Sequence, residues 1–471
     1  ILVQNQKTRY FYMENITACL EQVNLFLWNG PLLFLLSAAH LFFSCKFFPQ
    51  KYIGKAIRLS LRPEKNAIRE NNAAVPDRQT ADAHTGHGLN SFATLATTLA
   101  ATLGTGNIVG VSTAIALGGP GALFWCFLTG LLGMATAYCE CYLSCLYRRK
   151  DASGKLCGGP MYVMEYGLHN KLLGKFYALC VIFAALGVGC TTQSSAMADA
   201  AFSTFHLSPH VIGIGAAVLC GFVILGGMRS IGSFCSRLVP PLSILYMGAC
   251  LLLLGKNYRY LGESLQLILS SAFTKKAAVG GFCGSTFLMA ARFGIARGLF
   301  TNEAGIGTSA IAAGASASEN PMRQALVSMT AVFWDTIVMC TLTGFTIISS
   351  MLAHPGSAAA YSDAGLTTAA FTFLPHGDAF LSLSLMAFAL ATLVGWCYLG
   401  EKGVTYFFGK TAVKSYHLIY IVMIYFGAIL PMEIVWSFTD FINAVMVLPN
   451  VLCLFLLYKK IEKPSAKVFT H

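Results

Sequence analysis

The sequence predicts an all-α polytopic membrane protein, and three observations lead to that fold class. Of the 471 residues, 56% are hydrophobic and only 11% are charged, whereas a soluble domain carries about 25% charged residues. The mean hydropathy is +0.63. Apolar segments of about 20 residues, the length that crosses a bilayer at about 1.5 Å per residue, recur along the whole chain. So few polar side chains could not cover a soluble globule of this size.

The apolar segments give about eleven candidate transmembrane helices. They lie at about 24–45, 92–118, 121–147, 172–202, 210–228, 237–255, 282–315, 323–353, 379–408, 413–431 and 434–458. We expect one transmembrane domain over 1–471. Its expected parts are an extra N-terminal helix (1–45), a cytoplasmic connector (46–90), two sets of five helices (91–255 and 282–458) and a cytoplasmic tail (459–471).

The distribution of Lys and Arg predicts the orientation in the membrane. The formal net charge is +12, but the basic residues cluster in alternate polar segments between the apolar ones, as cytoplasmic loops do. Segments 203–209 and 354–378 contain no Lys or Arg, and segment 256–281 is an exception with four. We therefore expect a multi-pass protein of the plasma (inner) membrane, surrounded by the lipid bilayer. The N-terminus is expected outside and the C-terminus in the cytoplasm, with no nucleic-acid partner. The connector is expected to include an amphipathic part at the lipid surface.

Two of the predicted spans are interrupted by glycines. The second contains Leu103-Gly104-Thr105-Gly106-Asn107, and the seventh, about 34 residues long, contains Arg292-Phe293-Gly294 and a second glycine-containing stretch over 297–307. By the loop charges these two spans run in opposite directions, and each opens a set of five. Two five-helix units of opposite orientation, each opened by a broken helix, are typical of an inverted-repeat transporter.

A broken membrane helix offers a physical basis for binding. The break frees backbone N–H and C=O groups that lipid cannot satisfy. The half-helix that starts after the break attracts a carboxylate, and the carbonyls of the half-helix before it suit Na+. Glycines in an isolated small-xxx-small pattern are more often packing residues, but two breaks at matching places favour a binding site.

Other chemistries find no support in the sequence. The spacing of Gly104, Gly106 and Gly110 does not fit a dinucleotide-binding fingerprint, and no Lys-Ser/Thr pair follows to make a P-loop. HExxH and GxSxG arrangements and paired CxxC spacings are absent from the sequence. We therefore expect neither an enzyme nor an organic cofactor.

The motifs around the breaks resemble those of the alanine or glycine:cation symporter family. They are LGTGNIVGVSTAIALGGPGALFW at 103–125, GGPMYVMEYGL at 158–168, RGLFTNEAGIGTSAIA at 297–312, FWDTIVMCTLTG at 333–344 and TLVGWCYLGE at 392–401. The resemblance implies Na+- or H+-coupled uptake of alanine, glycine or a similar small neutral amino acid. It also implies a leucine-transporter-like five-plus-five inverted repeat plus one extra N-terminal helix.

The resemblance also implies which residues form the site. The substrate contacts fall on Thr105, Gly106, Asn107, Gln193, Phe293, Gly294, Thr392 and Trp396. Phe293 and Gly294 are expected at the break of the seventh span. The general pattern of the fold places Na+ between the carbonyls of Ala100 and Leu103 and the hydroxyl of Thr392. Residues next to Trp396 and Gln193 differ from those usual in the family, so the particular amino acid is left open.

Several polar residues in the spans have two readings. Gln193 either binds ligand or joins two helices, and Trp396 either packs in the core or limits the size of the substrate. Glu303 serves as a proton relay or as a structural cap. Charges inside a bilayer are usually paired, so Arg297 is expected to meet an acidic or carbonyl partner on the cytoplasmic side. Asp335 belongs to the same class of residue.

Two further alternatives concern position and function. Glu140 and Glu401 fall near predicted cytoplasmic helix ends, where a solvated position fits equally well. The function has its own alternatives, because a non-transporting amino-acid sensor or a channel with the same fold would present a similar pocket.

Overall fold

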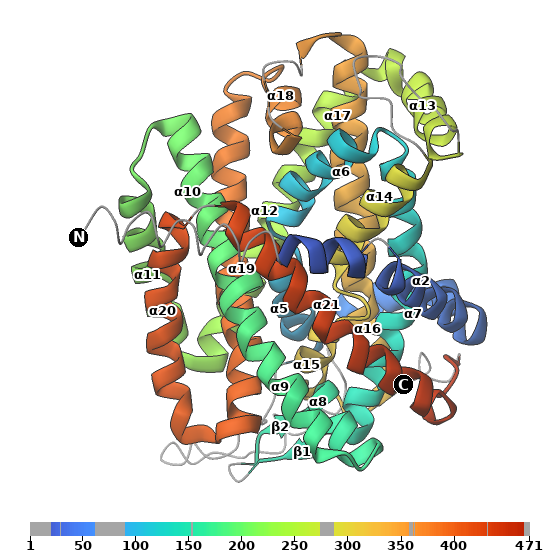
Figure 1. The fold of residues 1–471 in the computed structure, drawn as a ribbon, viewed down its shortest axis with the longest axis vertical. Coiled ribbons are helices and arrows are strands. Elements are labelled where there is room, and N and C mark those ends of the chain that lie inside the picture. The colour runs from blue at the N-terminus through green and yellow to red at the C-terminus, as the bar shows by residue number, and fades with distance from the viewer. Residues whose placement is uncertain are drawn as a thin grey trace, which may run out of the picture.

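The computed structural model describes residues 20–28, 30–61, 90–151, 154–273, 287–357, 361, 363–430 and 432–465. Figure 1 shows these residues as a bundle of helices. The greater part of the predicted connector 46–90 and the end of the predicted tail 459–471 lie outside the described residues.

The N-terminal region forms the expected extra helix. An apolar helical segment, Leu20–Phe47, includes α2 (Pro31–Phe47) and is followed by η1 (Pro49–Tyr52) and α3 (Ile53–Leu61). Helix α3 buries Ala56 and Leu59 and exposes Lys55 and Arg58. The described beginning of the connector is therefore amphipathic, as predicted.

The first set of five predicted spans contains one interrupted span, Ser91–Thr102 with Gly106–Gly118. In chain order its elements are α5 (Ser91–Thr102), η2 (Gly106–Gly110), α6 (Val111–Gly118), α7 (Ala122–Tyr147), β1 (Arg149–Lys150), β2 (Leu156–Cys157), α8 (Pro160–Tyr162), η3 (Val163–Gly167), α9 (Lys171–Leu186), η4 (Gly187–Thr191), α10 (Thr192–Phe205), α11 (Pro209–Leu225) and α12 (Gly227–Lys256). The antiparallel pair β1–β2 is the only sheet in the described part of the chain. Segments η5 (Tyr258–Tyr260) and α13 (Leu261–Phe273) then lead to the second set.

The second set of five predicted spans also begins with an interrupted span, which is divided into α14 and α15. Its elements are α14 (Phe287–Asn302), α15 (Thr308–Gly314), α16 (Pro321–Val332), η6 (Phe333–Cys340), α17 (Thr341–Ala353), η8 (Asp363–Gly365), α18 (Leu366–Phe371), α19 (Gly377–Phe408), η9 (Lys410–Ala412), α20 (Val413–Ile429), α21 (Met432–Leu457) and η10 (Tyr458–Lys460). The segments η2, η3, η4 and η6 are π-helical turns, which commonly mark functional sites.

Asparagine caps explain where several helices begin. The side chain of Asn90 accepts from the backbone N–H of Ala93 at 2.7 Å at the start of α5. Asn320 accepts from two backbone N–H groups at the start of α16, where Pro321 occupies the first turn. Such caps satisfy amides that have no partner inside the helix.

Fewer helices than eleven meet the length and composition expected of a span. In the described residues eight helices do so, or nine if the bent pair Ser91–Thr102 and Gly106–Gly118 counts as one span. The other two predicted spans are α11, which is apolar but has 17 residues, and the seventh span, which is divided into α14 with 16 residues and α15 with 7. One short helix and one break therefore account for the difference.

The first break lies where the sequence places it, and the second does not lie at Phe293 and Gly294. The helices on either side of Leu103–Thr105 differ in direction by 52°. By contrast, α14 runs without interruption through residues 292–294 and ends at Asn302. Gly294 serves helix packing instead, because a Cβ there would lie 2.2 Å from the carbonyl oxygen of Ala122 on α7.

The second break occupies residues 303–307, inside the other glycine-containing stretch. Glu303, Gly305 and Gly307 have φ angles of 56°, 99° and 97°, which lie in the left-handed region that ends a helix. Helix α15 resumes at Thr308. The prediction that the seventh span is broken is confirmed, and its position is corrected by about nine residues.

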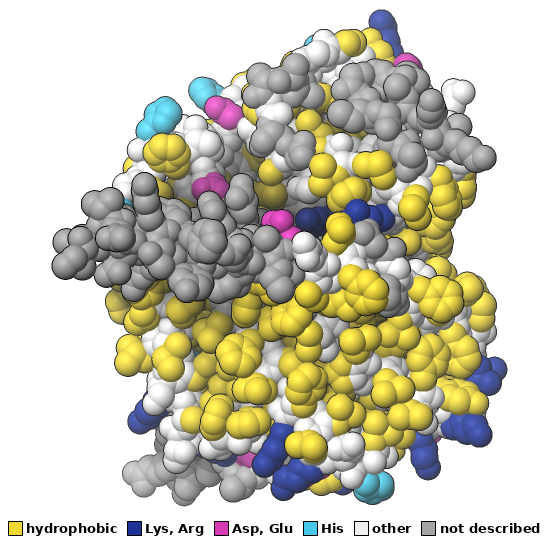
Figure 2. All heavy atoms as spheres, in the orientation of Figure 1, with side chains coloured by type: hydrophobic (Ala, Val, Ile, Leu, Met, Phe, Trp, Pro, Cys, Tyr) yellow, Lys and Arg dark blue, Asp and Glu magenta, His cyan; other side chains and the backbone are white. Residues whose placement is uncertain are grey.

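The outer surface suits a lipid environment. Figure 2 shows a broad area of hydrophobic side chains around the middle of the molecule. Exposed members include Phe34 at 78%, Phe222 at 77% and Leu225 at 74%. The buried core, by contrast, includes Trp396, Tyr398 and Tyr420, which are almost fully covered. This core surrounds the end of α5 and places the first break deep inside the protein.

Candidate functional site at the two helix breaks

Glycine at position 104 allows three segments to meet at the first break. A Cβ on Gly104 would lie 2.8 Å from the hydroxyl oxygen of Thr392 on α19 and 3.0 Å from Oε1 of Gln193 on α10. Such contacts are too short for any larger residue without displacement. The glycine therefore fits a close approach of polar side chains to the backbone.

Side chains satisfy the backbone groups that the break frees. The N–H of Gly104 donates to Oδ1 of Asn107 at 3.1 Å, and the N–H of Thr105 donates to Oε1 of Gln193 at 3.4 Å. The hydroxyl of Thr392 donates to the carbonyl of Leu103 at 3.1 Å. The structure thus brings together Asn107, Gln193 and Thr392, which the sequence assigned to one site.

Asn107 connects the break to a buried acid. Its Nδ2 donates to Oδ1 of Asp335 on η6 at 2.7 Å, and Oδ2 of Asp335 accepts from the hydroxyl of Thr336 at 2.7 Å. Asp335 has no exposed surface. This acid is unusual for a span, but no local pattern in the sequence assigns it to the site. The signal was a carboxylate in the apolar segment FWDTIVMC.

The segment before the second break lies against the first. A Cβ on Gly106 would be 2.7 Å from Cγ2 of Thr301 and 3.4 Å from Cδ1 of Phe300. The hydroxyls of Thr301 and Thr336 are 3.4 Å apart. Both interrupted spans therefore contribute to one buried polar cluster. Phe300 and Thr301 were not predicted as site residues.

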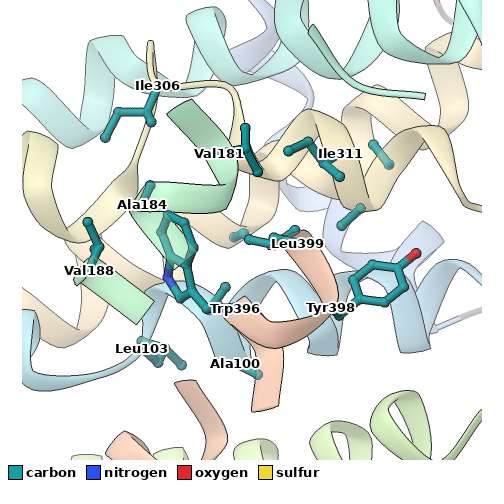
Figure 3. Packing of buried hydrophobic residues seen from close by; sticks show 14 of the residues in the cluster. Ala100, Leu103, Val181, Ala184, Val188, Ile306, Ile311, Trp396, Tyr398 and Leu399 are labelled. Carbon is teal, nitrogen blue, oxygen red and sulfur yellow. The ribbon is translucent and has the colours of Figure 1, made fainter. Parts of the chain in front are cut away.

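Trp396 packs tightly next to the first break. The side chain is 1% exposed. A Cβ placed on Gly189 of η4 would lie 2.1 Å from the Cβ of Trp396. Figure 3 shows its ring between Leu103 and Ile306 in that view. Packing in the core is one established role of this residue.

Phe293 and Gly294 are not brought to the first break. Gly294 faces α7, as described above. Phe293 lines a separate pocket of about 360 Å³, together with residues of the N-terminal helix, α14 and α21. The polar residues of that pocket include Arg297, whose Nη1 lies 4.0 Å from Oδ1 of Asp440. The expected acidic partner of Arg297 is therefore Asp440.

The residues of the expected Na+ site are also close together. Leu103 and Thr392 share the hydrogen bond given above. The carbonyl oxygen of Phe388 lies 3.0 Å from the same hydroxyl and is an alternative acceptor for its one proton. Gly395, almost one turn later on α19, lets the helix approach the backbone at Ala100 and Ala101, where a Cβ would lie 2.9 Å from the amide nitrogen of Ala101. Helix α19 thus covers the carbonyl end of α5.

Known proteins are similar to this chain in sequence and in fold. The model of the sodium:alanine symporter family matches residues 13–469. The sodium/alanine symporter AgcS of Methanococcus maripaludis is 37% identical, with 94% of this chain and 95% of the relative covered. The probable sodium/glutamine symporter GlnT of Bacillus subtilis is 31% identical, with 92% and 86% covered.

A solved structure supports the fold. The structure of MhsT in complex with L-phenylalanine has a TM-score of 0.53 and 15% identity, and covers 79% of this chain and 90% of that chain. It shares the leucine-transporter-like arrangement of helices. The chain is therefore a multi-pass membrane transporter and not an enzyme. It belongs to the sodium:alanine symporter family, whose members couple amino-acid transport to Na+.

Proposed function

We propose that this protein imports a small neutral amino acid, alanine or glycine, together with Na+ by alternating access. One observation supports this most strongly. At a single helix break, freed amide groups lie next to a freed carbonyl, and side chains from two other helices reach them. A zwitterion and a cation have complementary needs, because the carboxylate takes N–H donors and the cation takes carbonyl oxygens.

The amides at the break would take the substrate carboxylate. The contact from the Thr105 N–H to Gln193 is long, at 3.4 Å, so a charged carboxylate is a stronger acceptor for it than the neutral amide. The hydroxyl of Thr105 is buried and has no hydrogen-bond partner in the described structure. Gly106, Asn107 and Gln193 complete this part of the site. Phe293 and Gly294 are left out of it, because they lie elsewhere on α14.

The aromatic side chains around the site limit the size of the substrate. Trp396 borders the break from α19 and Phe300 borders it from α14. A methyl side chain suits the space between large rings better than a branched one. Fit alone discriminates by about 1–3 kcal/mol for each methylene, so we expect a graded preference for alanine and glycine over valine.

The carbonyl side of the break would take Na+. We assign to it the carbonyl oxygens of Ala100 and Leu103 and the hydroxyl oxygen of Thr392. All three are neutral oxygen donors, which suit a hard cation. Thr392 would turn its proton away from Leu103, toward the carbonyl of Phe388 that it already contacts at 3.0 Å.

The driving forces are sufficient for concentrative uptake. A membrane potential of about 100 mV supplies roughly 2.3 kcal/mol per charge. A tenfold Na+ gradient adds about 1.4 kcal/mol. With one Na+ per substrate the sum could support a substrate gradient of about 500-fold. H+ in place of Na+ would need the same site to bind a proton, which its neutral oxygens do not favour.

We propose that the end with the β1–β2 hairpin faces the cytoplasm and that the N-terminus lies outside. Lys410 pairs with Asp151 at 2.9 Å, so two of the basic connectors lie at the same end of the molecule. Figure 2 shows several Lys and Arg side chains at the lower end, where β1 and β2 lie in Figure 1. This arrangement agrees with the rule that positive loops stay inside.

Uptake of radiolabelled alanine into proteoliposomes tests the function. With an inward Na+ gradient the internal concentration is expected to exceed the external one. A sensor would bind alanine without accumulating it, and a channel would equilibrate it without regard to the gradient. Either result would replace the symporter proposal.

A further inference from the structure

The second helix break is held by a different set of side chains from the first. The N–H of Gly305 donates to Oε1 of Glu140 on α7 at 2.9 Å. Nδ2 of Asn450 on α21 donates to the same Oε1 at 2.6 Å and to the carbonyl of Gly305 at 2.9 Å. The hydroxyl of Tyr177 on α9 donates to the carbonyl of Ile306 at 2.6 Å. Three helices therefore fix the break through hydrogen bonds.

Two buried carboxyl groups belong to this cluster. Glu140 is 2% exposed and Glu303 is 3% exposed. Glu303 accepts from the hydroxyl of Thr308 across the break, which matches the structural cap that the sequence allowed. Every hydrogen-bond donor to the two carboxyls is neutral. In the described part of the chain, Lys, Arg and His make no ion pair with either of them.

Three polar atoms around the break are buried without a hydrogen-bond partner in the described structure. They are Oε2 of Glu140, Nε2 of His40 and Nδ2 of Asn302. His40 on α2 contacts Thr136, one turn before Glu140, at 2.7 Å from its Nδ1. Its ring also lies 4.0 Å from the position that a Cβ on Gly305 would take. Because unpartnered buried polar atoms are rare in proteins, their concentration at one loop points to exchange of a small polar species.

A proton suits this cluster better than a metal ion. The amide nitrogen of Asn450 already lies between Oε1 of Glu140 and the carbonyl oxygen of Gly305, where a cation would have to sit. An isolated charged carboxylate in a dry interior is unfavourable, and such a group takes up a proton instead. The single oxygen of Glu140 without a partner is the atom that can carry it.

We propose that Glu140 is a proton-binding site that controls the break between α14 and α15. In the conformation described here its carboxyl is protonated at Oε2. When the break opens and water enters, the proton leaves Oε2 for water, and the carboxylate that remains is hydrated. Closing the break therefore takes up one proton. This inference rests on the proposed function, because it links the opening of the transporter to pH.

The groups that face Glu140 leave its charge uncompensated. They are Glu303 at the break, Tyr177 on α9, and Cys139 and Cys141 on α7 itself. His40 on α2 and Cys453 on α21 lie next to this group, beside Gly305 and Tyr177. None of them is a permanent cation. A second acid, Glu303, lies close enough to disfavour a further negative charge. A proton on Glu140 therefore removes one of the two negative charges that the closed break would otherwise hold.

The test compares the Glu140→Gln variant with the wild-type protein, both at full length and in proteoliposomes. Glutamine keeps the shape and the acceptor oxygen of a protonated glutamate, so alanine exchange is expected to persist. Between pH about 6 and about 9, wild-type Na+-driven uptake is expected to fall at least threefold, and uptake by the variant is expected to stay level. Equal pH profiles in the two proteins would overturn the proposal.

An infrared measurement tests the proposal without transport. Wild-type protein at pH about 7 is expected to show a protonated-carboxyl band whose intensity falls in Glu140→Gln. Glu401→Gln is the matched control, because Glu401 lies 3.2 Å from His417 and 4.0 Å from Lys402, and its loss is expected to leave the band in place. A band of equal intensity in wild type and Glu140→Gln contradicts the proposal. If wild-type protein binds alanine but does not transport it, the proposed function fails while the infrared result still decides the protonation of Glu140.

A third measurement covers the case in which Glu140→Gln does not fold. Alanine binding to the wild type is measured by calorimetry in two buffers that differ in ionisation enthalpy. If binding closes the break, protons are taken up and the two apparent enthalpies differ. Identical enthalpies would overturn the coupling of the break to a proton.

Discussion

The amide nitrogen of Asn107 donates to a carboxylate oxygen of Asp335 at 2.7 Å, in a region with almost no solvent exposure. The opposite end of the same amide accepts from the backbone N–H of Gly104 at 3.1 Å. One side chain thus fixes the broken backbone to the π-helical segment η6. A substrate that binds the break would act on η6 through this amide.

Replacing Asn107 by alanine is expected to impair transport strongly. The change removes the partner of the Gly104 N–H and the Asn107 donor to Oδ1 of Asp335, and each such loss costs about 1–3 kcal/mol. We expect Na+-driven alanine uptake to fall at least about tenfold. The double variant Asn107→Ala/Asp335→Asn is expected to be less impaired than the sum of the two single variants. Additive losses would show that the two residues act independently.

Gly104→Ala is expected to abolish uptake, and Gly110→Ala is the matched control. The added methyl group at position 104 meets Thr392 at 2.8 Å and Gln193 at 3.0 Å, whereas a Cβ at position 110 has no atom within 4 Å. Gly110→Ala also removes the entropic cost of glycine in a helix, about 0.5–1 kcal/mol. The Gly110→Ala variant, solubilised in detergent, should therefore keep the melting temperature of the wild type. Normal uptake by Gly104→Ala would exclude the close polar contact at the break.

Gln193→Ala is expected to weaken alanine binding. The variant removes the oxygen that meets the N–H of Thr105 and the amide that donates to the carbonyl of Val188 at 3.3 Å. We expect KM for alanine to rise by about tenfold, equivalent to about 1.4 kcal/mol. Ser195 lies on the same helix, but its hydroxyl donates to the carbonyl of Leu430. The KM of the Ser195→Ala control for alanine should therefore be unchanged. Equal values of KM in all three proteins would remove Gln193 from the site.

Thr392→Val is expected to raise the Na+ concentration needed for half-maximal uptake. Valine has the shape of threonine but lacks the oxygen that contacts Leu103, so a neutral ligand of the cation is lost. Thr392→Ser keeps that oxygen and should stay near wild type. We expect a shift of about tenfold or more for the valine variant. A Na+ dependence that does not differ between the valine and serine variants would move the cation site elsewhere.

The sequence predicted the first break correctly because several local signals agree there. Gly104, Gly106 and the polar Asn107 fall together in an apolar span, and lipid penalises such a combination unless a break uses it. The partners Gln193 and Thr392 followed from the family resemblance, since no local pattern relates residues that lie so far apart in the chain.

The second break shows why local patterns can mislead. Arg292-Phe293-Gly294 and the stretch 297–307 both contain glycine, but only the latter has glycines with positive φ. Gly294 instead accommodates Ala122 of a neighbouring helix. Whether a membrane glycine breaks a helix or allows it to pack depends on that neighbour, and the sequence around the glycine does not contain it.

The buried acids were recognised less fully, for a similar reason. Asp335 lies 228 positions from its partner Asn107, so its place in the site depends on tertiary structure. For Glu140 a solvated position near a helix end fitted equally well, but the structure buries it against the loop 303–307. A long-range contact with a backbone amide gives no sequence signal.

Accumulation of radiolabelled alanine by wild-type proteoliposomes under an imposed Na+ gradient tests the central claim most directly. The claim is that an amino acid and a Na+ ion bind together at the break between α5 and η2. It predicts concentrative uptake that disappears when K+ replaces Na+ and that Thr392→Val shifts to higher Na+ concentrations. Alanine uptake of equal extent with and without the Na+ gradient would contradict it.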